Sequence, residues 1–160
     1  MTIWGALAGG FVGTLVLTTA MRAATELRLT RIDLPFLLGT AFSADRARAG
    51  AVGYALHFVF GLLFAAGYYA IFAALGEAAW WLGALLGVLH AAFAGTALVN
   101  VLLPLVHPRM GSNFSDASSA SLLEPPGFLL LNYGTRTPLV MLAVHVVYGA
   151  LIGACSAASG

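Results

Sequence analysis

The sequence predicts an all-α integral membrane protein whose four helices cross the bilayer as a bundle. Hydrophobic residues make up 61% of the 160 residues and charged residues only 8%, with a mean hydropathy of +0.95. This composition lies outside the range of soluble domains. The apolar residues fall in four uncharged stretches, each long enough to cross the hydrocarbon core, which takes about 20 helical residues. The short alternating segments of a transmembrane barrel do not occur, so helices are expected to satisfy the backbone polar groups in lipid.

The predicted spans form a single transmembrane domain and cover residues 3–24, 49–75, 79–106 and 137–158. Because Met1 to Trp4 carries no Lys or Arg, we expect the first span to be a retained helix and not a removable signal peptide. Pro104 and Pro108 are expected to mark the end of the third span. Cys155, in the fourth span, is the only cysteine, so no intramolecular disulfide can form.

The basic residues predict the orientation of the spans. All seven are arginines, in or beside the loops 25–48 and 107–136: Arg22, Arg28, Arg31, Arg46, Arg48, Arg109 and Arg136. By the positive-inside rule these two loops are cytoplasmic, and both termini and the turn around Glu77 lie on the opposite side. The three tryptophans fall at that opposite interface, where indole rings prefer the headgroup layer: Trp4, Trp80 and Trp81.

The two halves of the chain resemble each other. Trp4-Gly5-Ala6-Leu7 parallels Trp81-Leu82-Gly83-Ala84-Leu85, and Ala55-Leu56-His57-Phe58-Val59-Phe60-Gly61 parallels Ala143-Val144-His145-Val146-Val147-Tyr148-Gly149. Because the blocks keep one order, they predict two tandem helical hairpins related by a pseudo-twofold axis along the membrane normal. Chance similarity among Ala, Gly and Leu is the alternative, since the spacing differs in the third span. In the loops, the apolar segments Leu34 to Phe42 and Gly127 to Tyr133 are too short to span, so they are expected to lie along the interface or fold back against the bundle.

Glycines recur at helical spacing in every span and are predicted to be helix-packing residues. Steps of about four residues place them on one face, where the missing side chain lets a neighbouring backbone approach. They are Gly9, Gly13, Gly61, Gly87, Gly149 and Gly153. This face serves either the packing of the bundle itself or the docking of a partner subunit. Asn100, near the cytoplasmic end of the third span, is expected to form a hydrogen bond with a neighbouring helix.

Three histidines are predicted to lie near the middle of the membrane. His57 follows Arg48 by nine residues and His145 follows Arg136 by nine, which places both about 13 Å in from the cytoplasmic boundary. His90 lies at a similar depth from the other side. Ionisable groups at this depth are costly and usually face the bundle interior, which makes them candidates for function.

Several roles are open for these histidines. His57 and His145 could ligate the iron of a haem b, with Gly61 and Gly149 leaving room for the flat macrocycle. With His90 they could instead hold Zn or Cu, or they could hydrogen-bond across helices and so stabilise the bundle. A proton relay would need acidic partners, and every Asp and Glu lies in a loop.

The chain resembles small four-span bacterial membrane proteins of the YagU-like family. The similarity is carried by Thr18-Thr19-Ala20-Met21, Gly83-Ala84-Leu85-Leu86-Gly87-Val88-Leu89-His90, Leu105-Val106-His107-Pro108-Arg109-Met110 and His145-Val146-Val147-Tyr148-Gly149. The resemblance implies a multi-pass protein of the bacterial inner membrane with periplasmic termini. It implies no activity and no catalytic residue.

The leading hypothesis for function is a non-catalytic protein that acts through helix–helix contacts in the lipid bilayer, as a homo-oligomer or with other membrane subunits. It rests on the abundance of glycine faces and on the lack of a nucleophile–base or acid–base pair. The alternatives are a haem-binding electron carrier that uses the intramembrane histidines, and a small transporter. A net charge of +1 indicates no nucleic-acid partner.

Overall fold

The computed structural model, which describes residues 1–107 and 123–160, confirms an all-α four-helix bundle. Three of the long helices are continuous: α1 (Ile3–Glu26), α3 (Arg46–Leu75) and α6 (Thr137–Ala158). The fourth is assembled from α4 (Trp80–Phe93), the π-helix η1 (Ala94–Leu102) and α5 (Leu103–Val106). All four are long and apolar enough to cross a membrane. The chain is therefore a multi-pass membrane protein.

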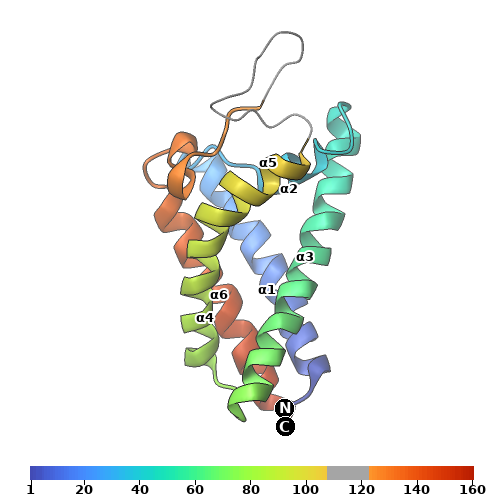
Figure 1. Cartoon of the computed structure of the whole chain (residues 1–160), viewed down its shortest axis with the longest axis vertical. Helices are drawn as coiled ribbons and strands as arrows, with labels where there is room; N and C mark the ends of the chain where they lie inside the picture. The colour runs from blue at the N-terminus through green and yellow to red at the C-terminus, as the bar shows by residue number, and fades with distance from the viewer. Residues whose placement is uncertain (108–122) are drawn as a thin grey trace.

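The helix ends explain where the spans begin and stop. The side chain of Asp45 accepts a hydrogen bond from the backbone N–H of Arg48 at 2.9 Å, so α3 begins at Arg46 and not at the predicted residue 49. The helix ends at Gly76, whose φ of +71° suits a residue without a Cβ. Both chain termini lie together at the end of the bundle opposite α2 and α5 (Figure 1), where the N–H of Thr2 donates to the hydroxyl of Ser159 at 3.1 Å.

Glycine contacts set the order of the helices. Helix α6 packs along α4 on one side and along α1 on the other, and α1 packs in turn along α3. A Cβ added at Gly9 would lie 2.8 Å from the Cα of Ile152, so α1 and α6 approach at backbone distance. A Cβ at Gly61 would collide with the hydroxyl of Thr14, which shows the same close approach between α3 and α1.

Helices α3 and α4 meet through rings and not through backbones. The ring centroids of Phe64 and His90 are 4.0 Å apart, and those of Phe64 and Phe93 are 6.4 Å apart. A twofold axis that exchanges α1 with α4 and α3 with α6 would make the α3–α4 contact equivalent to the α1–α6 contact. The two contacts differ in kind, and the internal repeat stays a prediction.

The third span contains a π-helical segment that the sequence pattern did not predict. Within it, the side-chain amide of Asn100 donates to the carbonyl oxygens of Gly95 and Thr96, both at 3.1 Å. The expected bond from Asn100 to a neighbouring helix is therefore wrong, because the side chain reaches carbonyls of its own wide helical turn instead. The span ends at Val106 with Pro104 in its last short helix, whereas Pro108 lies outside the described residues.

The two apolar loop segments fold back against the bundle. The first forms α2 (Leu34–Gly39), which lies against α3 so closely that a Cβ at Gly53 would collide with the carbonyl oxygen of Pro35. The second forms the 3-10 helix η2 (Phe128–Tyr133), which contacts η1 and α6. Leu130, at a φ of +64°, is fully buried there. Burial of this side chain offsets the cost of a left-handed backbone at a leucine.

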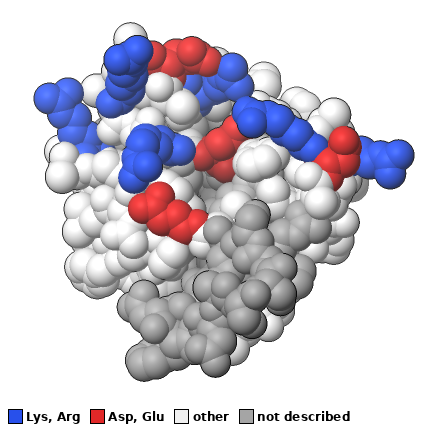
Figure 2. Space-filling model, turned by 90° about the horizontal axis from the view of Figure 1, so that it is seen from above, with Lys and Arg blue, Asp and Glu red and all other residues white. Residues whose placement is uncertain are grey.

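The arginines of the described residues gather at one end of the molecule (Figure 2). Hydrogen bonds and an ion pair join the two loops there. The N–H of Arg31 donates to the carbonyl of Tyr133 at 2.8 Å, the hydroxyls of Thr30 and Thr137 lie 2.8 Å apart, and the guanidinium of Arg31 lies 3.6 Å from the carboxylate of Glu124. The two Arg-bearing loops therefore form one connected layer over the bundle, while Arg109 lies outside the described residues.

Candidate functional site

The three candidate histidines come together inside the bundle. The ring centroids of His90 on α4 and His145 on α6 are 4.8 Å apart, at an interplanar angle of 75°. His57 on α3 is buried one turn before Gly61, whose carbonyl oxygen accepts a hydrogen bond from Tyr148 of α6. Only 8% of His57 and 5% of His145 is exposed, and His90 is half-buried. Three spans therefore contribute one imidazole each to a shared interior position.

The hydrogen bonds of the imidazoles set what each can do. Nδ1 of His145 lies 2.7 Å from the carbonyl oxygen of Met141, one turn earlier. A carbonyl only accepts, so this nitrogen carries the proton and Nε2 keeps its lone pair. The buried Nδ1 of His57, in contrast, has no hydrogen-bond partner among the described residues. A buried nitrogen without a partner is costly, and it calls for an explanation.

Aromatic side chains enclose the cluster. The ring of His90 lies against Phe64 and near the hydroxyl of Tyr68, whose oxygen is 3.5 Å from Nδ1 of His90. Its centroid is 5.7 Å from that of Tyr148, whose hydroxyl donates to the carbonyl oxygen of Gly61. The site is thus made of imidazoles, phenols and one phenyl ring. Such a set can donate, accept and pass protons.

The residues present do not fit a haem at this position. The room that Gly61 and Gly149 were expected to leave is taken by neighbouring helices, because a Cβ at Gly61 would meet Thr14 and one at Gly149 would meet the carbonyl oxygen of Gly83. In the part of the chain that the structure describes, no three His, Cys, Asp or Glu side chains are placed to hold a metal ion.

The six glycines singled out in the sequence all lie where helices of this chain touch. Each would bring an added Cβ against another helix: α6 for Gly9 and Gly13, α1 for Gly61, and the α4–α6 contact for Gly87, Gly149 and Gly153. Two other glycines of α3 differ, because a Cβ at Gly50 or Gly67 would meet nothing within 4 Å.

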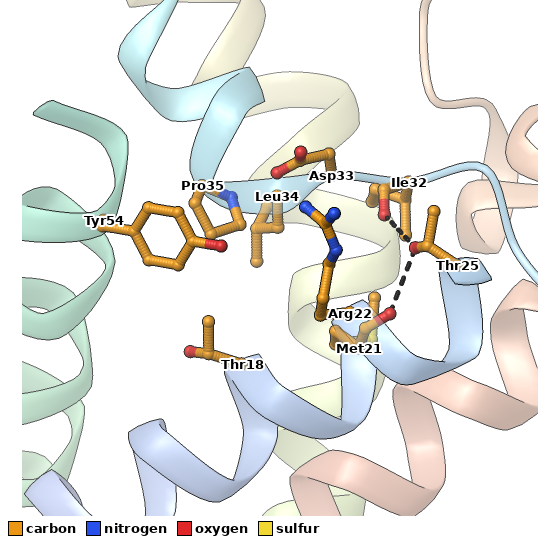
Figure 3. A pocket seen from close by; sticks show the side chains of 9 residues that line it. All are labelled: Thr18, Met21, Arg22, Thr25, Ile32, Asp33, Leu34, Pro35 and Tyr54. Atoms are coloured by element: carbon orange, nitrogen blue, oxygen red, sulfur yellow. Dashed lines mark hydrogen bonds between the residues drawn. The ribbon is translucent and has the colours of Figure 1, made fainter. Parts of the chain in front are cut away.

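A pocket opens at the arginine-bearing end, between α1, α2 and α3 (Figure 3). The empty space in the pocket and at its open mouth together is about 320 Å³. Its polar lining comes from Thr18, Arg22, Thr25, Asp33 and Tyr54, with Met21, Ile32, Leu34 and Pro35 supplying the apolar lining. The hydroxyl of Thr25 is already bonded to the carbonyls of Met21 and Ile32, each at 3.1 Å.

Sequence reasoning missed the aromatic enclosure and this pocket. Tyr68 and Phe72 lie on the same buried face of α3 as His57, at spacings of 11 and 15 residues that match three and four helical turns. That periodicity was readable in the sequence. Tyr54 and Asp33 carried no comparable signal, because they come together only when α2 folds against α3.

Comparison with models of known families, with characterised proteins and with solved structures finds no match to this chain.

Proposed function

We propose that this protein has a structural role in the membrane and pairs with a second copy of itself through the outward face of α3. The burial of the spans supports this proposal. Of the most apolar 18-residue window of each span, 39% is buried in α1, 39% in the third span and 44% in α6, but only 17% in α3. Helix α3 therefore contributes the most uncovered surface, although it crosses the membrane like the others.

Gly67 is the observation that carries the proposal. Inside a helix a glycine costs about 1 kcal/mol relative to alanine. The glycines at helix contacts offset this cost by letting backbones approach. Gly67 faces outward and touches no other part of the described chain. A helix from another chain is the kind of neighbour that would use the space it leaves.

The face around Gly67 suits a second copy of the same helix. It consists of exposed residues at helical spacing and carries no charge: Leu63, Gly67, Ala70 and Ala74. Small residues in the centre allow close approach, and Leu63 extends beyond them. A twofold pairing brings the same face from both copies together, which needs only a self-complementary surface. Two-copy assembly is also the commonest closed form of oligomer.

Cysteine cross-linking in a Cys155→Ser background tests the pairing. Gly67→Cys should give a disulfide-linked dimer in native membranes. Leu89→Cys is the matched control, since Leu89 is 61% exposed on α4 and should stay monomeric. Gly67→Leu should separate the purified dimer into monomers without unfolding it, because a Cβ added at this position meets nothing within 4 Å in the described chain.

A Gly67→Cys protein that cross-links no better than Leu89→Cys contradicts the pairing. So does a monomeric mass for the wild-type protein in lipid nanodiscs. A cross-link between Gly67→Cys and a different membrane protein would show that another subunit, and not a second copy, packs against this face. That result would also contradict the proposal.

The proposal includes a location in a bacterial inner membrane with the arginine-bearing end in the cytoplasm. The clustering of the arginines at that end supports it (Figure 2), as do the outward-facing indoles of Trp4 and Trp80, which are 76% and 63% exposed. Reporter fusions should be active in the cytoplasm when placed after Arg28, and in the periplasm when placed after Gly76. The reverse pattern would overturn this orientation.

A further inference from the structure

His57 is the one imidazole of the cluster whose buried nitrogen has no partner among the described residues. It lies on α3, three residues after Tyr54, and so on the same side of the helix about one turn further into the membrane. Tyr54 lines the pocket at the arginine-bearing end. His57 therefore lies about one helical turn further into the membrane than Tyr54, which lines the pocket.

The lining of the pocket is polar at the mouth and carries hydroxyls further in. Figure 3 shows the hydroxyl of Tyr54 pointing into the space between α3 and α1, with Thr18 below it and the side chains of Arg22 and Asp33 above. Among the acidic residues, which the sequence placed only in loops, Asp33 is thus brought to the entrance of this space. Water is stabilised in such a setting, because several polar groups face one small volume.

Polar groups continue from the pocket to the histidines. The hydroxyl of Thr18 donates to the carbonyl of Thr14 at 2.6 Å, and the hydroxyl of Thr14 faces Gly61. The carbonyl of Gly61 accepts a hydrogen bond from Tyr148, whose ring lies beside that of His90. Toward the chain termini the core contains the completely buried side chains of Phe72 and Ile152 and the buried hydroxyl of Ser156. The polar groups named above lie on the arginine-bearing side of the histidines.

We infer that this pocket is the entrance through which solvent protons reach His57, so that His57, His90 and His145 form a proton-accepting site open to the arginine-bearing side. A hydronium ion in the pocket transfers its proton to the lone pair of Nδ1 of His57. Water is left behind, and the imidazole gains one positive charge. This inference does not rest on the pairing through α3.

The groups around the cluster limit how many protons it takes up. The titratable groups that face it are His57 and Tyr68 from α3, His90 from α4, and His145 and Tyr148 from α6. Helix α1 contributes only buried apolar, glycine and threonine residues. No carboxylate faces the cluster in the described residues; Asp33 and Arg22 stay at the mouth. Because like charges repel, the three imidazoles accept one proton at a time.

Access to the pocket is tested with single cysteines in a Cys155→Ser background. Thr18→Cys should react with a membrane-impermeant trimethylammonium methanethiosulfonate reagent at least about tenfold faster than Thr19→Cys, since thiol reactivity follows exposure to water. The two positions are matched, because both hydroxyls bond the carbonyl four residues earlier, but Thr19 faces outward toward lipid.

Access of protons to His57 is then measured by hydrogen–deuterium exchange at C2 of the imidazoles, in the full-length protein in nanodiscs. Labelling Thr18→Cys should slow the exchange of His57 at least about tenfold relative to the same protein before labelling, since exchange requires access to solvent. His107 is the internal control. It bonds Thr40 and Leu37 outside the pocket, so its exchange should not change.

Two results would overturn the inference. One is that Thr18→Cys is as unreactive as Thr19→Cys, which would mean that water does not enter the pocket. The other is a labelled Thr18→Cys protein in which His57 exchanges as before, which would mean that protons reach it by another route. Because the exchange of His57 is compared in one protein before and after labelling, an effect of the substitution on stability does not imitate the second result.

Discussion

The backbones of Gly83 and Gly149 are in direct contact where α4 crosses α6. An added Cβ at either residue would collide with the carbonyl oxygen of the other. Two glycines on facing helices therefore set how closely this pair approaches. The same crossing carries His145, whose carbonyl oxygen lies against Gly87. Any change in the α4–α6 distance is thus transmitted to the histidine cluster.

This contact predicts the effect of enlarging either glycine. Gly149→Val should destabilise the protein by about 1–3 kcal/mol, the range for overpacked sites, because the obstacle is backbone and cannot rotate away. Gly50→Val is the control, since a Cβ added at Gly50 would meet nothing within 4 Å in the described chain and Gly50 lies outside the proposed pairing face. Reversible unfolding of the purified protein in detergent measures both. Equal loss of stability in the two variants would show that β-branching, and not the contact, is responsible.

The hydrogen bond between Thr30 and Thr137 predicts a second loss of stability. It joins the loop after α1 to the start of α6, and Thr137 is fully buried. Thr137→Val keeps the shape but leaves the hydroxyl of Thr30 with one partner fewer, so it should cost about 1 kcal/mol. Thr137→Ser retains the hydroxyl and should cost less. The ranking is measured by unfolding, and a Ser variant less stable than the Val variant would contradict it.

The contact between the rings of His90 and Phe64 is predicted to hold α3 against α4. With spin labels at Val59 on α3 and Leu85 on α4, both exposed at the surface, His90→Ala should broaden the interlabel distance distribution, because the contact with Phe64 is lost. His90→Phe should preserve a narrow distribution, since it keeps a ring at this place. If His90→Phe broadens it as much as His90→Ala, the imidazole nitrogens and not the ring hold the helices.

Tyr133, which lies outside the spans, is expected to make the stability of the protein depend on pH at high pH. Burial, and then the Glu124 carboxylate, raise the pKa of the Tyr133 phenol, while Arg31 acts in the opposite direction. A raised pKa means that the folded state favours the neutral phenol. This contribution to stability is complete below the unfolded value of about 10, and it is lost as the pH rises through the folded pKa.

The difference in phenolate absorbance between the wild-type protein and Tyr133→Phe isolates the titration of Tyr133. It should have its midpoint above that of an unfolded tyrosine. In Arg31→Gln the midpoint should move higher still, because a positive charge that lowers the pKa of the Tyr133 phenol is removed. A midpoint that falls on removing Arg31 would contradict this account.

Parts of the candidate site were readable from spacing and parts were not. The depth of His57 and His145 follows from counting residues along a helix of fixed rise. The rotation of each helix about its axis decides whether His90 joins these two histidines. It also decides whether Phe64 and Tyr148 enclose them. Rotation is decided by which glycine meets which neighbour, and a composition of Ala, Gly and Leu leaves several such choices nearly equal. For the same reason the spacing did not reveal that the space beside Gly61 and Gly149, expected to leave room for a haem, is filled by facing helices.

The sequence by itself determined the number of helices able to span the membrane and the gathering of the arginines in two loops, because hydropathy and charge act locally along the chain. Only the tertiary structure decided the order in which the helices pack, the π-helical turn around Asn100, the grouping of the histidines, and the meeting of Asp33 with Tyr54 at the pocket. These features arise from contacts between segments far apart in the chain. In lipid such contacts depend on the fit of surfaces and not on hydrophobicity, which every span shares.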